Sequence, residues 1–159
     1  MDKLWAPWRI KYIRANNKKR CIFCQAKKKE GSDYVFLKTA HSLAMLNIFP
    51  YNNGHAMVAP LKHVKDLDAL NEAEILDLVS TLQKTKKLLK KVLQPQGYNI
   101  GINLSAEAGA GIPEHLHIHI VPRWKGDTNF MPIIFKTKVI SQSLAELFKQ
   151  LKKCSIKQR

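Results

Sequence analysis

Six consecutive residues restrict the fold of this chain more than any other segment. They alternate histidine with an aliphatic residue, in the order His115-Leu116-His117-Ile118-His119-Ile120. Because successive side chains of a β-strand point to opposite faces, a strand here would place three imidazoles on one face and three aliphatic side chains on the other. The pattern therefore predicts a strand in a sheet that packs one face on a core and presents histidines on the other.

Short apolar runs bounded by turn residues predict the rest of this sheet. The expected strands cover residues 34–38, 42–47, 55–59, 98–104 and 114–121. Pro60 and Pro122 are expected to close the third and the fifth of them, because proline cannot donate to a ladder of backbone hydrogen bonds. The short connections between the first three strands favour antiparallel pairing.

Two capping-box patterns predict helices. Asn71 with Glu74 precedes a stripe of apolar residues that recur every three or four positions, and Pro95 ends that stripe. Ser143 with Glu146 precedes a short amphipathic segment near the C-terminus. Together with the strands, these signals predict an α+β fold: a five-stranded, mainly antiparallel sheet with one long helix and a C-terminal helix.

The chain of 159 residues is long enough for one folded domain with an extension at each end. We expect an N-terminal arm over residues 1–33, a domain over 34–151 and a basic tail over 152–159. The arm contains Cys21-Ile22-Phe23-Cys24, which is expected to form a knuckle. With only three cysteines in the chain, this pair favours a metal site, while a redox dithiol and two incidental thiols are the alternatives.

Lysine and arginine outnumber aspartate and glutamate by 27 to 12, which gives a net charge of +15. The basic residues lie in short runs along the whole chain, so a nucleic-acid interface is not expected. The same positive field would attract a small polyanion such as a nucleotide. No apolar run approaches the roughly 18 residues that span a bilayer, so we expect a cytoplasmic protein without membrane association.

The histidine face calls for chemistry that other polar residues do not supply. Imidazole is a nucleophile, a general base and a metal ligand near neutral pH. The Cα atoms of His115 and His119 would stand about 13 Å apart in a strand, which is too far for all three rings to bind one ion. A metal ion would therefore take one ring and recruit other ligands.

Residues 115–121 resemble the His-x-His-x-His-x-x signature of the histidine-triad (HIT) superfamily of nucleotide hydrolases and transferases. Residues 46–60 are similar to the nucleotide-binding strand–loop–strand of that family, and the resemblance covers roughly residues 4–150. The segments 4–9 and 122–131, with the cysteine pair, resemble a bacterial and archaeal branch known as diadenosine tetraphosphate phosphorylase-like.

The resemblance implies a covalent mechanism in which the middle histidine attacks the α-phosphorus of a nucleotide. By this match His117 is the nucleophile, His119 contacts the phosphate and His115 positions the site. The implied substrate is a dinucleoside polyphosphate or a related nucleotide conjugate, with phosphate or water as the acceptor. A homodimer is also implied. A nucleotide-binding or sensing protein without significant turnover is the alternative function.

The nucleotide-binding residues are implied by the same resemblance. They are Leu46, Asn47, Ile48, Phe49, Asn103, Gly109, Gly111 and Trp124. Asn47 is expected on the ribose hydroxyls, or only to end a strand and turn the chain, and Asn103 is expected near the ribose or phosphates. The apolar residues would line an adenine slot or serve as ordinary core residues. The glycine loop would donate N–H groups to a phosphate or serve only as a turn. Trp124 would stack on a second base or pack at a dimer seam.

One segment departs from the family pattern. Many relatives carry a Gln-Ser or Gln-Thr pair shortly before the triad, where this chain has Gly111-Ile112-Pro113-Glu114. The contacts to the leaving group are therefore left open, and the departure is compatible with the phosphorylase-like branch.

Zinc-containing relatives imply a set of metal ligands. Mapped onto this chain they are Cys21, Cys24, His55 and His115, with His41 or His63 as alternatives to His55. Two thiolates and two imidazoles suit a closed, structural Zn²⁺ site that is not required for the chemistry itself. The alternative is a pair of reduced, metal-free thiols.

Overall fold

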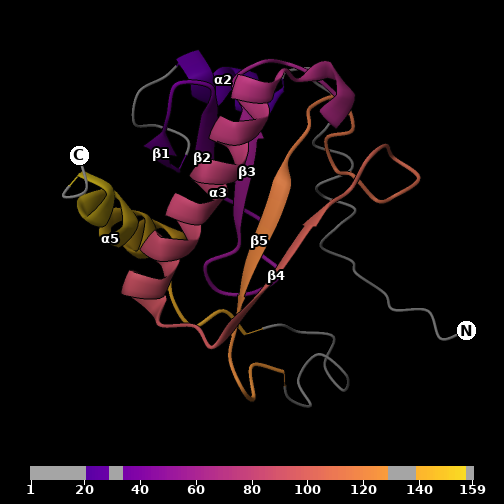
Figure 1. Ribbon diagram of the computed structural model, residues 1–159. Coiled ribbons are helices and arrows are strands. Elements are labelled where there is room, and N and C mark those ends of the chain that lie inside the picture. The colour runs from indigo at the N-terminus through magenta and orange to yellow at the C-terminus, as the bar shows by residue number, and fades with distance from the viewer. Residues whose placement is uncertain (1–20, 29–33, 129–138, 157–159) are drawn as a thin grey trace, which may run out of the picture.

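The computed structural model describes residues 21–28, 34–128 and 139–156 (Figure 1). In chain order its elements are α2 (Ile22–Lys28), β1 (Val35–Lys38), β2 (Ser42–Leu46), β3 (Ala56–Pro60), the 3-10 helix η1 (Leu67–Ala69), α3 (Glu72–Leu93), β4 (Gly97–Ile102), β5 (Ile118–Arg123) and α5 (Leu144–Ile156). The expectations for segment 4–9 and for the end of segment 122–131 lie outside these residues.

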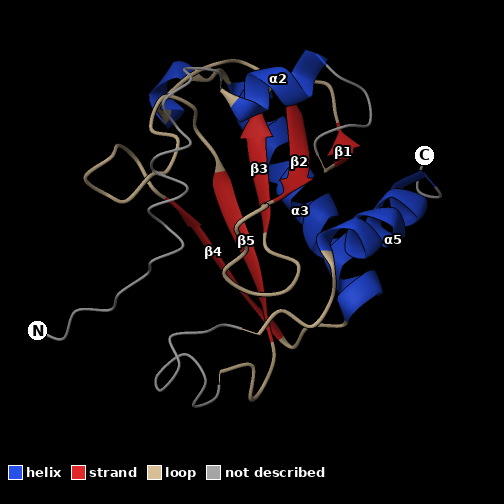
Figure 2. Ribbon diagram, turned by 180° about the vertical axis from the view of Figure 1, so that it is seen from behind, coloured by secondary structure: helices blue, strands red, loops and turns tan. Residues whose placement is uncertain are grey.

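The five strands form one sheet in the order β1-β2-β3-β5-β4, and every neighbouring pair is antiparallel. The long helix α3 lies across one face of the sheet, with α5 beside it (Figure 1). The short helix α2 lies on the opposite face, near β2 and β3 (Figure 2). The predicted α+β fold, with one long helix and a C-terminal helix, is confirmed.

The sheet has a buried core on both faces, because helices cover both. On the α3 face, Ala44, Leu46, Ala56, Val58, Leu88 and Leu89 belong to one cluster of buried residues. On the α2 face, Phe23, Leu43, Met45, Met57 and Ala59 belong to a second cluster. The aliphatic half of the alternating segment, Leu116, Ile118 and Ile120, lies in the α3 cluster. The alternation thus directs the histidines to the face that carries α2.

The ends of the two main helices follow the capping signals. The side chain of Asn71 accepts from the backbone N–H of Glu74, and Glu74 accepts from that of Asn71, which is the predicted capping box. Helix α5 begins after Ser143 as expected but continues to Ile156. Residues 152–156 therefore belong to the helix and not to a separate tail. None of the described helices has the length and apolar character needed to cross a membrane.

The fifth strand and the arm differ from the sequence expectation. The strand begins at Ile118 and includes Pro122, which was expected to end it. The carbonyl of Pro122 faces Asn52, beyond the last β3 pair at Ile120, so the missing N–H of the proline costs no ladder hydrogen bond. In the arm, the Cys-x-x-Cys segment is the start of helix α2 and not an irregular knuckle.

Candidate active site

The three triad histidines lie on the α2 face of the sheet at the start of β5. His115 and His117 have 1% and 3% of their surface exposed, and His119 is only partly buried. The Cα register pairs His119 with Met57 of β3 on one side and Gly101 of β4 on the other. The triad therefore runs from a closed end at His115 to an open end at His119.

The hydrogen bond of His117 defines which ring nitrogen can react. Its Nδ1 lies 2.8 Å from the carbonyl oxygen of His115. Because a carbonyl can only accept, Nδ1 carries the proton and Nε2 keeps its lone pair. Burial lowers the pKa of His117 below its ordinary value, which favours this neutral form. His117 is therefore held as a neutral imidazole whose Nε2 keeps its lone pair.

A fourth histidine, His55, sets the tautomer of His119. The backbone N–H of Tyr51 and the side-chain amide of Asn47 both approach Nδ1 of His55, at 3.1 and 3.4 Å. Nδ1 must accept, so His55 carries its proton on Nε2, which lies 2.9 Å from Nδ1 of His119. His119 in turn carries its proton on Nε2. Sequence analysis missed this role of His55.

Burial keeps these rings uncharged at neutral pH. It lowers the pKa of His55 to about 3, helped by repulsion from His119 and His117. Burial also lowers the pKa of His119 to about 4 and that of His115 to about 4. The site therefore offers neutral imidazoles, as lone-pair donors or as N–H donors, rather than a cluster of cations.

Two further aromatic side chains extend the row of imidazoles. The Phe23 ring, which is 1% exposed, lies 4.9 Å from the His115 ring and 5.1 Å from the His117 ring, measured between centroids. At the open end, Tyr51 lies 4.5 Å from His55 and is 48% exposed. Sequence analysis singled out neither. The place of Phe23 between two predicted metal ligands was the one available signal for it.

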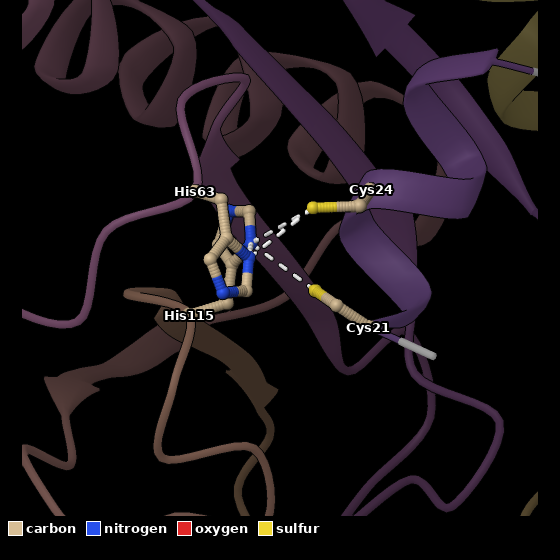
Figure 3. A group of neighbouring side chains, drawn as sticks. All are labelled: Cys21, Cys24, His63 and His115. Atoms are coloured by element: carbon tan, nitrogen blue, oxygen red, sulfur yellow. Dashed lines mark hydrogen bonds between the residues drawn. The ribbon is translucent and has the colours of Figure 1, made fainter. Parts of the chain in front are cut away.

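Four side chains at the closed end form a compact group that fits a metal ion: Cys21, Cys24, His63 and His115 (Figure 3). Their ligand atoms all lie within 4.8 Å of one another. The two Nδ1 atoms are 3.0 Å apart, and the thiols approach them at 3.1 to 3.7 Å. Tetrahedral Zn²⁺ would hold such atoms about 3.3–3.8 Å apart. The chemistry and spacing of this set fit zinc.

His115 is oriented for this group by a carbonyl. Its Nε2 lies 2.9 Å from the carbonyl oxygen of Pro60, so Nε2 carries the proton and Nδ1 faces the thiols with its lone pair. Histidine ligands of metals are commonly oriented in this way by a hydrogen bond from their other nitrogen. The same residue thus links the Cys/His group to His117 through its own carbonyl.

The structure corrects the mapped ligand set, because His63 and not His55 completes it. The reason is the antiparallel register, in which Ala56 pairs with Ile120 and Val58 with Ile118. Moving along β5 toward His115 therefore means moving toward the C-terminal end of β3, and His63 follows that end. His55 precedes β3 and meets His119 instead.

The residues predicted to bind the base and ribose are divided between two environments. Asn47 lies beside His55, and its Oδ1 accepts from the N–H of Phe49, so it also turns the chain after β2. Ile48 is 50% exposed, and Phe49 is partly buried. Leu46, in contrast, is fully buried in the α3 cluster, on the other face of the sheet. Of the two alternatives for Leu46, the structure shows the core position and not the nucleotide slot.

The predicted phosphate loop and Trp124 lie beyond the strand ends. Gly109 has a φ of +88° and donates its N–H to the carbonyl of Ala106, so it shapes a tight turn. Gly111 and Asn103, on the same connection between β4 and β5, are partly exposed. Trp124 follows β5 and is also partly buried.

The end of β5 is tied to the loop before β3 by a polar network. The Asp127 carboxylate, whose side chain is 7% exposed, forms an ion pair with Arg123 at 2.6 Å and accepts from the Asn52 amide at 2.8 Å. Arg123 also donates to Oδ1 of Asn99 at 2.7 Å. These contacts fix the guanidinium of Arg123 beside β4.

Residues 28–126 match the HIT domain family. The chain is 38% identical over 156 residues to the AP-4-A phosphorylase of Mycobacterium tuberculosis, covering 92% of this chain and 80% of that protein. It is 35% identical over 101 residues to the asymmetrical bis(5'-nucleosyl)-tetraphosphatase of Schizosaccharomyces pombe, covering 64% of this chain and 55% of that protein.

Solved structures share the fold. A hypothetical histidine triad nucleotide-binding protein from Sulfolobus tokodaii has a TM-score of 0.70 and 26% identity, covering 87% of this chain and 93% of that one. A Zn-bound histidine triad family protein from Mycobacterium smegmatis has a TM-score of 0.70 and 23% identity, covering 87% and 94%. Sequence and fold agree that this chain belongs to the histidine-triad (HIT) superfamily, in its AP-4-A phosphorylase-like branch.

Proposed function

We propose that the protein is an enzyme that cleaves dinucleoside polyphosphates, or related nucleotide conjugates, at the α-phosphate through a covalent nucleotidyl-His117 intermediate. The observation that carries the proposal is the neutral His117 ring, whose Nδ1 donates to the His115 carbonyl and whose Nε2 keeps a lone pair. The phosphorylase and tetraphosphatase names of the relatives support a nucleotide hydrolase or transferase.

In the first step, Nε2 of His117 attacks the α-phosphorus. The N–P bond forms as the P–O bond to the leaving group breaks, and the leaving oxygen takes the electron pair of that bond. The Nε2–H of His119, whose tautomer follows from the His55 contact, is placed to hydrogen-bond this oxygen or a phosphate oxygen. The His117 and His119 rings lie 4.8 Å apart, so one phosphate can contact both.

In the second step, an acceptor oxygen attacks the same phosphorus and the N–P bond breaks, which returns the electron pair to Nε2 of His117. Inorganic phosphate as acceptor would release a nucleoside diphosphate, and water would release a nucleoside monophosphate. Splitting one displacement into two lowers the barrier of each. The identity with the M. tuberculosis AP-4-A phosphorylase favours phosphate.

The nucleotide would lie on the α2 face of the sheet, beside the open end of the triad. Asn47 is adjacent to His55 there, and its amide would bind the ribose hydroxyls. Ile48 and Phe49 follow it and would contact the base. Gly109, Gly111, Asn103 and Trp124 would approach the phosphates or a second base.

A structural zinc ion would be held by Cys21, Cys24, His63 and His115. It would fasten the start of α2 to the loop after β3, and it supplies no step of the reaction. The ion would fix His115, whose carbonyl orients His117. The Zn-bound protein from M. smegmatis, which shares the fold, supports the presence of zinc but does not identify its ligands.

A cytoplasmic homodimer is the expected form of the enzyme. Ile75, Leu76 and Val79 of α3 and Ile100 of the edge strand β4 are at least 40% exposed, which is the apolar surface that a second copy could bury.

The proposal is tested by incubating the protein with diadenosine tetraphosphate, with and without inorganic phosphate, and resolving the nucleotides. ADP with ATP, formed only with phosphate, is expected; AMP with ATP would indicate a hydrolase. His117→Ala should abolish both, whereas His41→Ala, at an exposed histidine, should not. If both the wild-type protein and His117→Ala bind the nucleotide equally and neither forms products, the protein is a nucleotide-binding or sensing protein and not an enzyme.

A further inference from the structure

The edge strand β4 carries almost no side chains on the face that bears the triad. Gly97, Asn99 and Gly101 alternate on that face, in Cα register with Arg123, Val121 and His119 of β5. Residues directly opposite each other in an antiparallel pair point to the same face. Gly101 therefore lies directly beside the His119 ring, and the three β4 residues form a bare strip that leads away from it.

Neither backbone conformation nor packing within one subunit explains the two glycines of this strip. Among the described glycines, positive φ angles occur at Gly54, Gly109 and Gly126, and not at Gly97 or Gly101. A Cβ atom built on Gly101 meets no atom within 4 Å, and one on Gly97 meets only the Cβ of Arg123, at 4.0 Å. Glycine weakens a strand interior, and it often marks a place where a ligand approaches the backbone closely.

We infer that the strip Gly97, Asn99 and Gly101 is the subsite for the leaving part of the substrate, a nucleoside polyphosphate, and that Gly101 limits how bulky that part can be. The inference rests on the proposed function and takes the first of its two partners for the Nε2–H of His119, which is the leaving oxygen. From there the chain of phosphates would run along β4, away from the closed end of the triad. A side chain at Gly101 would occupy the first part of that path.

The strip also offers groups that bind phosphate. The amide of Asn99 accepts from Nη1 of Arg123 through its oxygen, so its NH₂ group is directed away from that contact. Arg123 has five N–H donors. Three of these donors contact Asp127 and Asn99 among the described residues, and the Arg123 side chain is 44% exposed. The amide of Asn99 therefore lies two residues from Gly101 along β4. The guanidinium of Arg123 lies four residues from His119 along β5.

The test compares two substrates that share the transferred nucleotide and differ in the leaving group. Diadenosine tetraphosphate loses ATP, whereas adenosine 5'-phosphofluoridate loses a single fluoride ion. Gly101→Val should lower kcat/KM for diadenosine tetraphosphate at least tenfold and change that for the phosphofluoridate less than threefold. Gly101→Ala should fall between Gly101→Val and the wild-type protein.

Ile100→Val is the matched control, because Ile100 is the neighbouring residue on the opposite face of β4 and is 48% exposed. Ile100→Val should leave kcat/KM unchanged for both substrates. Equal losses for both substrates with Gly101→Val, or no loss for either, would overturn the inference while the proposed function stands. A change in oligomeric mass by light scattering would assign the glycines to a subunit contact and also overturn it. If the wild-type protein turns over neither substrate, the proposed function fails and the inference with it.

Discussion

The burial of His55 predicts a specific dependence of stability on pH. Its side chain is fully buried, and burial lowers its pKa to about 3, while an unfolded chain has a histidine pKa of about 6.5. Because the folded pKa is the lower one, protons bind preferentially to the unfolded state. The stabilising contribution is therefore complete above pH 6.5 and is lost as the pH falls from about 6.5 toward 3.

The size of the effect follows from the two pKa values. At pH 5, about 1.5 pH units below the pKa of an unfolded histidine, this residue is protonated in the unfolded chain and still neutral in the folded one. The free energy of unfolding is therefore about 2 kcal/mol lower than it is above pH 6.5. His55→Gln removes the titrating group but keeps an N–H donor for His119. Between pH 7 and pH 5 the free energy of unfolding of the wild-type protein should therefore fall by about 2 kcal/mol more than that of His55→Gln.

Urea unfolding at both pH values measures this difference between the two proteins. Other titrating groups, metal ligands included, contribute to both proteins and cancel to first order. His41→Gln is the matched control at an exposed histidine and should follow the wild-type slope. If the free energy of unfolding falls equally between pH 7 and pH 5 in the wild-type protein and in His55→Gln, the reasoning is refuted, because His55 is then not held neutral by burial.

The remaining predictions concern the metal ligands and the folding of the domain. His63→Ala should weaken zinc binding at least about tenfold in competition with a chromophoric chelator, whereas His41→Ala should not; equal effects would contradict the ligand set. Asn71→Ala removes the α3 cap and should lower the free energy of unfolding by about 1 kcal/mol, measured in urea. Gly54→Ala should lower the free energy of unfolding by more than about 1 kcal/mol in the same assay, because φ is +75° and the new Cβ would collide with the side chain of Leu93. An unchanged urea midpoint would contradict both reasons.

Local patterns were sufficient for most of the fold. The alternation at 115–120 correctly assigned Leu116, Ile118 and Ile120 to the core, because side-chain direction in a strand follows from position alone. The capping box at Asn71 and Glu74 located the start of α3 for the same reason: both partners lie within one helical turn. Strand positions were also predicted to within a few residues, since turn residues delimit them.

Contacts between distant segments decided the rest. Pro122 continues β5 because its missing N–H falls on a side where β3 has already ended, which depends on the length of another strand. The helix at Cys21 and Cys24 was not predicted, since a seven-residue helix has little intrinsic stability and depends on packing. Phe23 within it is held by the α2 cluster and the triad rings.

The sequence alone predicted that three histidines share one face of the segment that leads into β5, and that the central one is the nucleophile. Only the tertiary structure decided that His63 joins Cys21, Cys24 and His115, and that His55 instead orients His119. Residue spacing cannot distinguish two histidines that flank the same strand. The antiparallel register of β3 against β5 does so, because it brings opposite ends of β3 to opposite ends of the triad.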